Sequence, residues 1–584
     1  MHSGFSRLFR ANTEIITGNS TATEVETMRS ALIINVRTAD RHRGARLSLP
    51  VVLITCLAIL TGANAVSAGA AGSACVPVSD PVYDFLEACV ARGILPLWSI
   101  NMRPLSRARI GDLLQLVIMD YPKLADKVLE AELDYYLREF AGDIINRSDR
   151  SGSDARTLRL VRYDPVKALH DPHWHAVVFR RDGFDFTLDP LIRFRVDADR
   201  DQSIFRRATG IQFRAVYDGG IGCYFRFVDH VERGNGPYLS RADLLEDRYG
   251  YVGPLQGARE TYYDMTEAYL ATELSNFEFA FGKDRLSWGP ARGNDLLLSG
   301  TAPSFNQLRI GFRPFDKVRF GYVLGCLQAW NAPTDTLYQT DRGWTRISRP
   351  KKWIAAHRVE YMPWGWISLS VNESVIWGDR GLDWSYINPI NFYFSAEHDG
   401  DDQDNVLLSG DCIVRIGRSG LLYGELLIDD MKLSTLGEGD PGNKFGVVIG
   451  AKLLDTGLDG LTSGIEYARL DPYVYTHFYP VNRYSNWTSS LGSDLAANSD
   501  RLRYRLRYRP RRNVELRVEI DRHRRGTVGA DPYDSVERNH KGSVRFLDGN
   551  PESWISAGSR FSWEPAVGVV LGAGWISNDR RSFV

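Results

Sequence analysis

Hydrophobic and polar residues alternate strictly along the segment from Arg501 to Pro510, whose sequence is RLRYRLRYRP. One face of this segment would carry arginines only, and the other would carry leucines and tyrosines. A period of two residues predicts a half-buried β-strand, because a helix with 3.6 residues per turn would scatter the arginines around its circumference. The segment from Val514 to Asp521 alternates in the same way, with acids on its polar face. The two segments together predict a β-hairpin.

The predicted hairpin forms a ladder of opposite charges. A loop at residues 510–512 would place Arg507 opposite Glu515, Arg503 opposite Glu519 and Arg501 opposite Asp521. The ladder comprises Arg501, Arg503, Arg505, Arg507, Glu515 and Glu519. Two environments suit such a ribbon. One is a soluble sandwich whose charges face water, and the other is an outer-membrane barrel whose charges line the lumen while leucine and tyrosine face lipid.

Strand-like segments follow one another from residue 155 to the end of the chain. Some are joined by tight connections, such as residues 313–316, and others by long ones, such as residues 332–350 and 379–405. This alternation, together with strands near the 9–11 residues that cross a bilayer at a tilt, indicates a transmembrane antiparallel β-barrel. We predict about 16 to 18 strands, in an even number because closure of such barrels usually requires one. A secreted multi-domain β-protein is the alternative, but the chain lacks the linkers that separate such domains.

Residues 79–150, which precede the strands, have a helical pattern. Apolar side chains recur there at spacings of three and four residues, and each run is bounded by capping residues, Gly or Pro. Three helices are expected, at residues 79–93, starting with Ser79 or Asp80 as N-cap, at 106–121, and at 124–140. These helices predict a small bundle ahead of a barrel at residues 155–584.

Residues 1–68 are expected to be a cleaved targeting region. The apolar run at residues 50–62 is too short to span a bilayer as a helix, but arginines precede it and small residues follow it. This order is typical of a secretory signal. Because the stretch before Arg41 is long for a signal, Met28 is the expected start of translation. A disordered cytoplasmic tail is the alternative.

Charge and cysteine content exclude several classes of protein. The net charge of -1 and the near-neutral pI give no preference for nucleic acid. The six cysteines show no CxxC or Cys/His metal spacing. Cys75 and Cys89 would either form a disulfide in an oxidising periplasm or remain free. Since no catalytic motif occurs in a fitting context, we expect no enzyme, cofactor or metal.

Several long motifs resemble the capsule assembly Wzi family of Gram-negative outer-membrane proteins. They are SDPVYDFLEACVARG, RPLSRARI, FGKDRLSWGPARGNDLLLSGTAPSFNQLRI, INPINFYFSAEH, DNVLLSGD and LYGELLIDDMKL, in this order between Ser79 and residue 433. The resemblance extends from about Ser79 to the C-terminus. It implies an 18-stranded barrel whose periplasmic end is closed by the helical bundle, and a lectin-like surface protein that anchors capsular polysaccharide.

The segment WGPARGNDLLLSGTAPSF contains the first group of candidate polysaccharide-binding residues. Trp288, Arg292 and Asn294 lie in its glycine-rich part. Arg292 and Asn294 could face sugar hydroxyls or carboxylates. The alternative is a turn that constricts the barrel.

The segment from Asp379 to Asn405 contains the second group, Arg380, Trp384, Tyr386 and Tyr393. Trp384, Tyr386, Phe392 and Tyr393 could stack on sugar rings, and Arg380 could pair with a uronic acid. The acids Asp399, Asp401, Asp402 and Asp404 are better explained as a solvated loop than as Ca²⁺ ligands, because the EF-hand spacing is missing. Glu397 and His398 have no nucleophile at a defined spacing that would support acid/base chemistry.

Two further patterns keep alternatives open. HDPHWH could supply metal ligands from His173 and His175, but histidines around a proline turn are more often surface residues. The arginine ladder would fill the lumen with ion pairs or seat a plug, or else form a track for anionic sugar.

We therefore expect an outer-membrane lectin that anchors capsular or other surface polysaccharide. Its expected partners are that polysaccharide, outer-membrane lipid and the barrel-assembly machinery. A substrate-selective channel for anionic solutes or glycans is one alternative. A glycan or lipid hydrolase of the outer membrane is the other.

Overall fold

The computed structural model describes most of the chain from Ala70 onward. Outside the description are residues 1–69, 72, 122–125, 142, 144–156, 161–174, 182, 199–201, 218–219, 236–258, 330–334, 344, 401–402, 456, 532–541, 567 and 583–584. The expected targeting region and Met28 lie in this undescribed part. Residues Ala68–Val584 form one compact unit.

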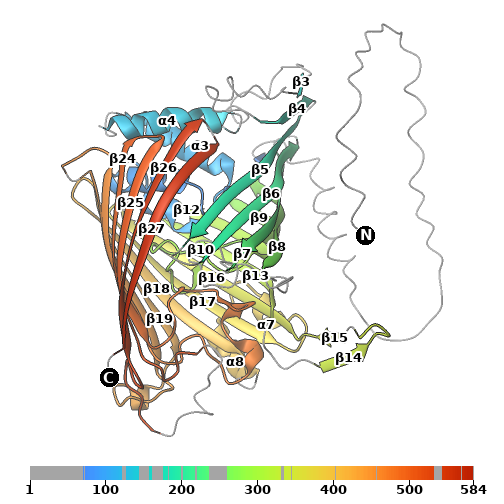
Figure 1. The fold of residues 1–584 in the computed structure, drawn as a ribbon, viewed down its shortest axis with the longest axis vertical. Coiled ribbons are helices and arrows are strands. Elements are labelled where there is room, and N and C mark those ends of the chain that lie inside the picture. Colours follow the sequence, from blue (N-terminus) through green and yellow to red (C-terminus); the bar gives the residue numbers. More distant parts are fainter. Residues whose placement is uncertain are drawn as a thin grey trace. The chain divides into compact units, whose positions relative to one another are not determined.

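A large antiparallel sheet rolls into a barrel (Figure 1). Its strands are β1 (Ala70–Ala71), β3 (Thr157–Leu160), β4 (Val177–Arg181), β5 (Phe184–Ala198), β6 (Ser203–Tyr217), β7 (Ile221–Gly234), β8 (Glu260–Leu274), β9 (Phe277–Asp284), β12 (Phe305–Phe315), β13 (Val318–Gln328), β16 (Lys351–Trp364), β17 (Ile367–Gly378), β18 (Asn405–Ile416), β19 (Gly420–Asp430), β20 (Lys444–Leu454), β21 (Leu461–Leu470), β24 (Ser499–Arg511), β25 (Val514–Arg525), β26 (Glu552–Ala566) and β27 (Val569–Ser582). Because β1 and β3 are segments of two and four residues, eighteen strands form the main wall. The predicted barrel is confirmed.

Connections between neighbouring strands alternate between short and long. Tight turns such as residues 316–317, 365–366 and 417–419 lie at one end of the barrel, where the helices α3 and α4 also lie (Figure 1). Long connections lie at the opposite end, and some carry their own elements. These are β10 (Ser287–Trp288), β11 (Leu298–Ser299), β14 (Asp335–Gln339), β15 (Thr345–Ser348), α7 (Trp384–Ile387), α8 (Tyr393–Asp399), η5 (Leu433–Thr435), η6 (Pro480–Asn482), β22 (Ser485–Asn486) and β23 (Ser489–Ser490).

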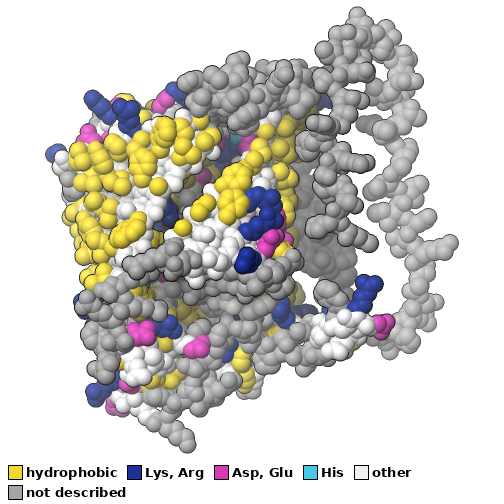
Figure 2. Space-filling view, viewed as in Figure 1, with side chains coloured by type: hydrophobic (Ala, Val, Ile, Leu, Met, Phe, Trp, Pro, Cys, Tyr) yellow, Lys and Arg dark blue, Asp and Glu magenta, His cyan; other side chains and the backbone are white. Residues whose placement is uncertain are grey.

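The outer face of the wall is apolar. Figure 2 shows hydrophobic side chains gathered over β24–β27. Exposed residues on these strands include Leu502, Tyr504, Ile520, Phe561 and Trp575. In β24 the intervening Arg501 and Arg503 are buried, so their side chains point into the lumen. This alternation is the pattern of a lipid-facing barrel wall.

The register of the β24–β25 hairpin differs from the prediction by two residues. Arg503 lies opposite Asp521, and Arg505 lies opposite Glu519. The predicted loop at residues 510–512 was wrong, because β24 continues through Pro510 to Arg511 and a bulge follows Tyr508. A shift by two residues leaves every side chain on its predicted face.

Three helices precede the barrel strands and form what we term the head. They are α2 (Val82–Ala91), α3 (Arg107–Met119) and α4 (Lys127–Glu139), with the short η2 (Leu97–Ile100) and β2 (Met102–Arg103) between α2 and α3. Asp80 accepts a hydrogen bond from the Val82 amide at 2.9 Å, and the Ser106 hydroxyl accepts one from the Arg109 amide at 3.0 Å. Ser106 is the N-cap of α3, whereas the N-cap of α2 is Pro81, one residue after the predicted Asp80.

The head packs against lumen-facing side chains of the wall, and its helix α4 lies across the short-turn end of the barrel (Figure 1). Leu86 and Leu114 of the head share one hydrophobic core with lumen-facing Ile354 and Leu427 and with Leu296, and all five are fully buried. Cys75 and Cys89 are buried and free, and the other cysteines that the structure describes are free and partly buried. Within the described residues, no helix combines the length and apolarity needed to cross a membrane as a helix.

Candidate functional site

The β17–β18 connection, residues 379–404, folds over the outside of the barrel wall, and we term it the outer collar. It carries α7 and α8. Glu373 holds it in place, because its carboxylate accepts hydrogen bonds from the Tyr393 and Phe394 amides at 2.9 and 2.7 Å. Glu373 lies on the same face of β17 as the exposed Val371, whereas Asn372 points inward. The collar therefore covers the outer face of the wall at its long-connection end.

Aromatic residues divide the collar into a buried and an exposed layer. Tyr386 and Tyr393 are buried against Trp377 of β17, with a ring-centroid distance of 5.0 Å between Trp377 and Tyr386. Trp384 is 78% exposed, and Ile390, Phe392 and Phe394 are also exposed. Of the four residues predicted in this segment, only Arg380 and Trp384 reach the surface. Tyr386 and Tyr393 support them from below.

A carboxylate holds the charged end of the collar together. Asp404 accepts hydrogen bonds from both terminal nitrogens of Arg380 and from the Tyr386 hydroxyl, the latter at 2.7 Å. The hydrogen bond to Asp404 raises the pKa of Arg380, and burial together with Asp404 raises the pKa of Tyr386. Both groups are therefore locked in their protonated forms. The exposed edge of Arg380, which lies 3.4 Å from Asp383 at the start of α7, offers guanidinium donors to solvent.

The first predicted group lies inside the barrel. The β9–β12 connection, residues 285–304, folds into the lumen, and Trp288 and Asn294 on it are buried. Asn294 donates to Glu466 on the wall at 3.0 Å. Arg292 donates to Asp84 of α2 and lies 3.4 Å from Glu87. The structure places these three residues in a packed lumen, where they join the head to the wall.

The arginine ladder also faces the head. Arg503 pairs with Asp521 at 2.6 Å, Arg505 pairs with Glu519 at 2.8 Å, and Arg501 pairs with Asp494 at 3.0 Å. Further along β24, Arg507 contacts Asp84 and Arg509 contacts Glu132 of α4. Glu515, predicted to pair with Arg507, instead contacts Arg517 at 2.8 Å. One half of the ladder is thus neutralised within the wall and its long connections, and the other half holds the head.

Sequence reasoning missed the acids of the head. Asp84, Glu87 and Glu132 are the partners of Arg292, Lys452, Arg507 and Arg509. Burial opposes ionisation of Asp84, but Arg292 and Arg507 hold its pKa well below the usual range. The signal was present, because Asp84 and Glu87 are three residues apart on a helix that is otherwise apolar. Buried acids of this kind require cationic partners.

The remaining candidates form no site in the described chain. Asp401, Asp402, His170 and His173 lie outside the described residues. His175 pairs with Asp189 at 2.9 Å, and Asp404 belongs to the collar network. Among the residues with described positions, no group of three metal-ligating side chains comes together.

A family model described as "Capsule assembly protein Wzi" matches residues 199–559. The chain belongs to the Wzi capsule assembly family. The match covers the strands from β6 to most of β26, which is narrower at both ends than the resemblance noted in the sequence. Family membership and the apolar outer wall place the protein in the outer membrane of a Gram-negative bacterium.

Solved structures of outer-membrane barrels are similar to this chain. Wzi of Escherichia coli, described as a carbohydrate-binding β-barrel involved in group 1 capsule assembly, is 13% identical, with 88% of this chain and 96% of that chain covered and a TM-score of 0.49. OccD3 (OpdP) of Pseudomonas aeruginosa is 12% identical, with 68% and 87% covered and a TM-score of 0.39. OccK8 (OprE) of the same organism is 12% identical, with 68% and 94% covered and a TM-score of 0.36. A search of curated proteins found no match.

Proposed function

We propose that this protein binds surface or capsular polysaccharide and retains it on the cell, without catalysing a reaction on it. The observation that carries the proposal is the filled lumen of a Wzi-family barrel. The head, the 285–304 connection and the 471–498 connection share a core with fully buried Leu296, Leu297 and Tyr484. A barrel filled in this way offers its outer end, rather than a pore, to a polymer.

The outer collar is the part of that end best suited to sugar. Short turns of outer-membrane barrels face the periplasm and long connections face the exterior, so the collar lies on the exterior side. Trp384 presents an apolar ring on which a pyranose can stack, and Arg380 on the same collar presents donors for hydroxyls or a uronate. We also propose that the mature chain consists of the helical head and the barrel, and that residues 1–68 are a leader that is removed.

The channel alternative is less well supported. A selective pore needs charged side chains that remain available to a solute. Arg501, Arg503 and Arg505 are each paired with a carboxylate within about 3 Å, and Arg507 and Arg509 are engaged by the head. We expect purified protein to conduct poorly in planar bilayers, and steady conductance that falls when these arginines are neutralised would favour the channel.

The direct test compares cell-bound with released polysaccharide. A strain lacking the protein should make the same total amount of polymer and shed most of it, and the complemented strain should retain it. A complementing Arg380→Gln/Trp384→Ala variant should shed polymer, since both exposed contacts are lost. The matched control is Arg233→Gln/Trp575→Ala, which removes a guanidinium and an indole that are both exposed but lie away from the collar.

Three outcomes are distinguishable. Shedding by the deletion and by the collar variant supports both the function and the site. If only the deletion strain sheds polymer, the proposed function stands and the sugar contact lies on another long connection. Unchanged retention in the deletion strain overturns the proposed function.

A further inference from the structure

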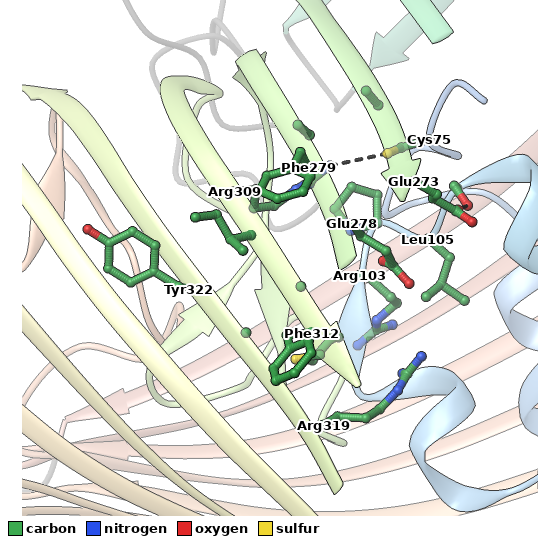
Figure 3. Close-up of a pocket in the computed structure, with 18 of the residues that line it drawn as sticks. Cys75, Arg103, Leu105, Glu273, Glu278, Phe279, Arg309, Phe312, Arg319 and Tyr322 are labelled. Carbon is green, nitrogen blue, oxygen red and sulfur yellow. Dashed lines mark hydrogen bonds between the residues drawn. The ribbon is translucent and has the colours of Figure 1, made fainter. Parts of the chain in front are cut away.

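A cavity lies between the head and the wall (Figure 3). Its volume is about 70 Å³. Residues from β8, β9, β12 and β13 line one side, and residues 102–106 of the head line the other. Glu273 of β8 and Glu278 of β9 lie opposite each other in the sheet, next to the β8–β9 turn. Because short turns face the periplasm, this part of the cavity lies at the periplasmic end. The cavity lies on the inner side of the wall and the outer collar on its outer side, and Tyr322, which lines the cavity, also donates to collar carbonyls.

Two paired glycines keep this space open. Gly311 of β12 lies opposite Gly321 of β13, and both line the cavity. A β-carbon at Gly321 would lie 2.9 Å from the Met102 sulfur, and one at Gly311 would lie 3.3 Å from the Glu278 β-carbon. Side chains at these positions would occupy the hollow. The wall is therefore built with a recess where the head meets it.

Four arginines and two glutamates supply the charged lining. Arg103, Arg309, Arg313 and Arg319 line the cavity, and Figure 3 shows Arg103, Arg319 and Glu278 converging on the same space. Arg309 pairs with Asp284 at 3.3 Å, and Arg103 lies 3.8 Å from Asp295. Neither Arg313 nor Arg319 has a carboxylate within 4.0 Å in the described part of the chain. Glu278 stands in the same cavity and likewise forms no ion pair there.

Several guanidinium groups keep unused donors. The Nε–H groups of Arg103, Arg313 and Arg319 are buried and have no acceptor among the described residues. Arg103 and Arg319 are themselves only 3% and 4% exposed. A buried donor without an acceptor is destabilising, because it has lost its hydrogen bond to water. Three buried guanidinium donors at the cavity thus have no acceptor among the described residues.

Trp98 adds a second constraint on these charges. The Arg319 and Arg109 guanidiniums lie 3.9 and 4.6 Å from the Trp98 ring centroid, and Arg319 also donates to the Trp98 carbonyl at 3.2 Å. Burial lowers the pKa of Arg109 to about 10, and the charge of Arg313 contributes to the shift. Stacking fixes the guanidiniums in place while their charges repel one another.

We propose that this cavity binds an oxyanion, a carboxylate or phosphate group carried by a ligand that enters from the periplasmic end. Such a group would accept hydrogen bonds from Arg313 and Arg319 and relieve the repulsion among the guanidiniums. The cavity has room for a small anionic substituent. A planar guanidinium matches either group by paired hydrogen bonds.

The test uses the full-length barrel in detergent and equilibrium dialysis at low ionic strength. The probes are inorganic phosphate, acetate, and acetamide as the neutral counterpart of acetate. We expect one equivalent of phosphate or acetate to bind, and acetamide not to bind. Arg313→Gln and Arg319→Gln should each weaken binding about tenfold or more, because each removes a charge-assisted hydrogen bond.

Two further variants separate binding from misfolding. Glu278→Gln should strengthen anion binding severalfold by removing a repelling carboxylate, which a misfolded barrel would not do. Arg233→Gln, in the exposed pair with Glu260 on β7 and β8, should leave binding unchanged. Preference for acetate would indicate a carboxylated ligand, and preference for phosphate a phosphorylated one. Binding of neither probe, or binding that is indifferent to Arg313 and Arg319, would overturn the proposal.

Discussion

Arg507 on β24 donates a hydrogen bond to Asp84 on α2, which lies 423 positions earlier in the chain. Arg292 of the 285–304 connection donates to the other oxygen of the same carboxylate. One carboxylate therefore joins the head, the wall and an inward-folded connection. Because the site is largely buried, the three charges are screened little by salt and depend on one another.

Replacing Asp84 with Asn should loosen the head. Arg292 would keep a partner in Glu87, whereas Arg507 would be left without a carboxylate, and breaking a buried pair on one side typically costs 3–5 kcal/mol. We expect a loss of about 3 kcal/mol in the local opening free energy of α2, which corresponds to roughly hundredfold faster amide exchange. Hydrogen–deuterium exchange of the folded barrel measures this directly.

The control for Asp84→Asn is Asp134→Asn on α4. Asp134 forms an exposed i,i+4 pair with Arg138, and such pairs contribute about 0.3–0.5 kcal/mol. The depressed pKa of Asp84 means that its contribution is present above the unfolded value of 3.8 and is lost only as the pH falls well below it. Equal exchange in the two variants at neutral pH would contradict the role of Asp84 as a three-way link.

Sequence periodicity predicts the wall well, because lipid and lumen impose opposite polarity on successive residues. Leu502 and Tyr504 face outward and Arg501 and Arg503 inward, as alternation requires. Residue pairing across the β24–β25 hairpin was less predictable. One bulge after Tyr508 shifts the register by two residues and leaves every side chain on the same face. The hydrophobic pattern therefore cannot reveal the bulge.

Contacts between distant segments explain the rest of what the sequence left open. Trp288 and Asn294 have the composition of a sugar-binding loop, but their loop folds inward against the head. Nothing local specifies that direction, since it depends on Glu466 and other wall residues far along the chain. Sequence reasoning also grouped Tyr386 and Tyr393 with Trp384, because nothing local in the sequence shows which of these rings are buried. Only the packing against Trp377 separates supporting rings from exposed ones.

Replacing Asp404 with Asn should loosen the outer collar without removing any exposed contact. The substitution removes the charge that holds Arg380 and weakens the acceptor of the Tyr386 hydroxyl. Hydrogen bonds to charged groups contribute about 1.5–3 kcal/mol, so we expect about 2 kcal/mol of lost protection in α7 and α8 amides. Exchange in both helices should accelerate, and cell-associated polysaccharide should fall. Asp399→Asn at the exposed end of α8 is the matched control, and a comparable effect there would argue against the network.

His477 should make the 471–498 connection sensitive to acid. Burial lowers the pKa of His477 to about 4, and nearby Lys444 adds to the shift, while Asp430 opposes it. Because the folded pKa is below the unfolded one, the stabilisation is complete above about pH 6.5 and is lost as the pH falls towards 4. Limited proteolysis near the exposed Phe478 and Tyr479 should therefore increase from pH 7 to 4.5. His477→Gln should flatten this dependence, and an unchanged slope in that variant would assign it to other groups.

A charge on the outer wall should test the membrane-facing surface most simply. Ile449 lies midway along β20 and is 59% exposed, whereas the neighbouring Val448 is fully buried in the lumen. An arginine at the bilayer midplane of a barrel costs about 2–4 kcal/mol, so Ile449→Arg should reduce folding into lipid vesicles by that amount. The control Leu433→Arg places the same charge in the β19–β20 connection, where Leu433 is exposed, and should cost less than about 0.5 kcal/mol. The folding free energy of both variants can be measured by urea titration, with the folded fraction read on a gel from the band whose mobility changes on heating. If Ile449→Arg folded as well as Leu433→Arg, the middle of β20 would not face lipid.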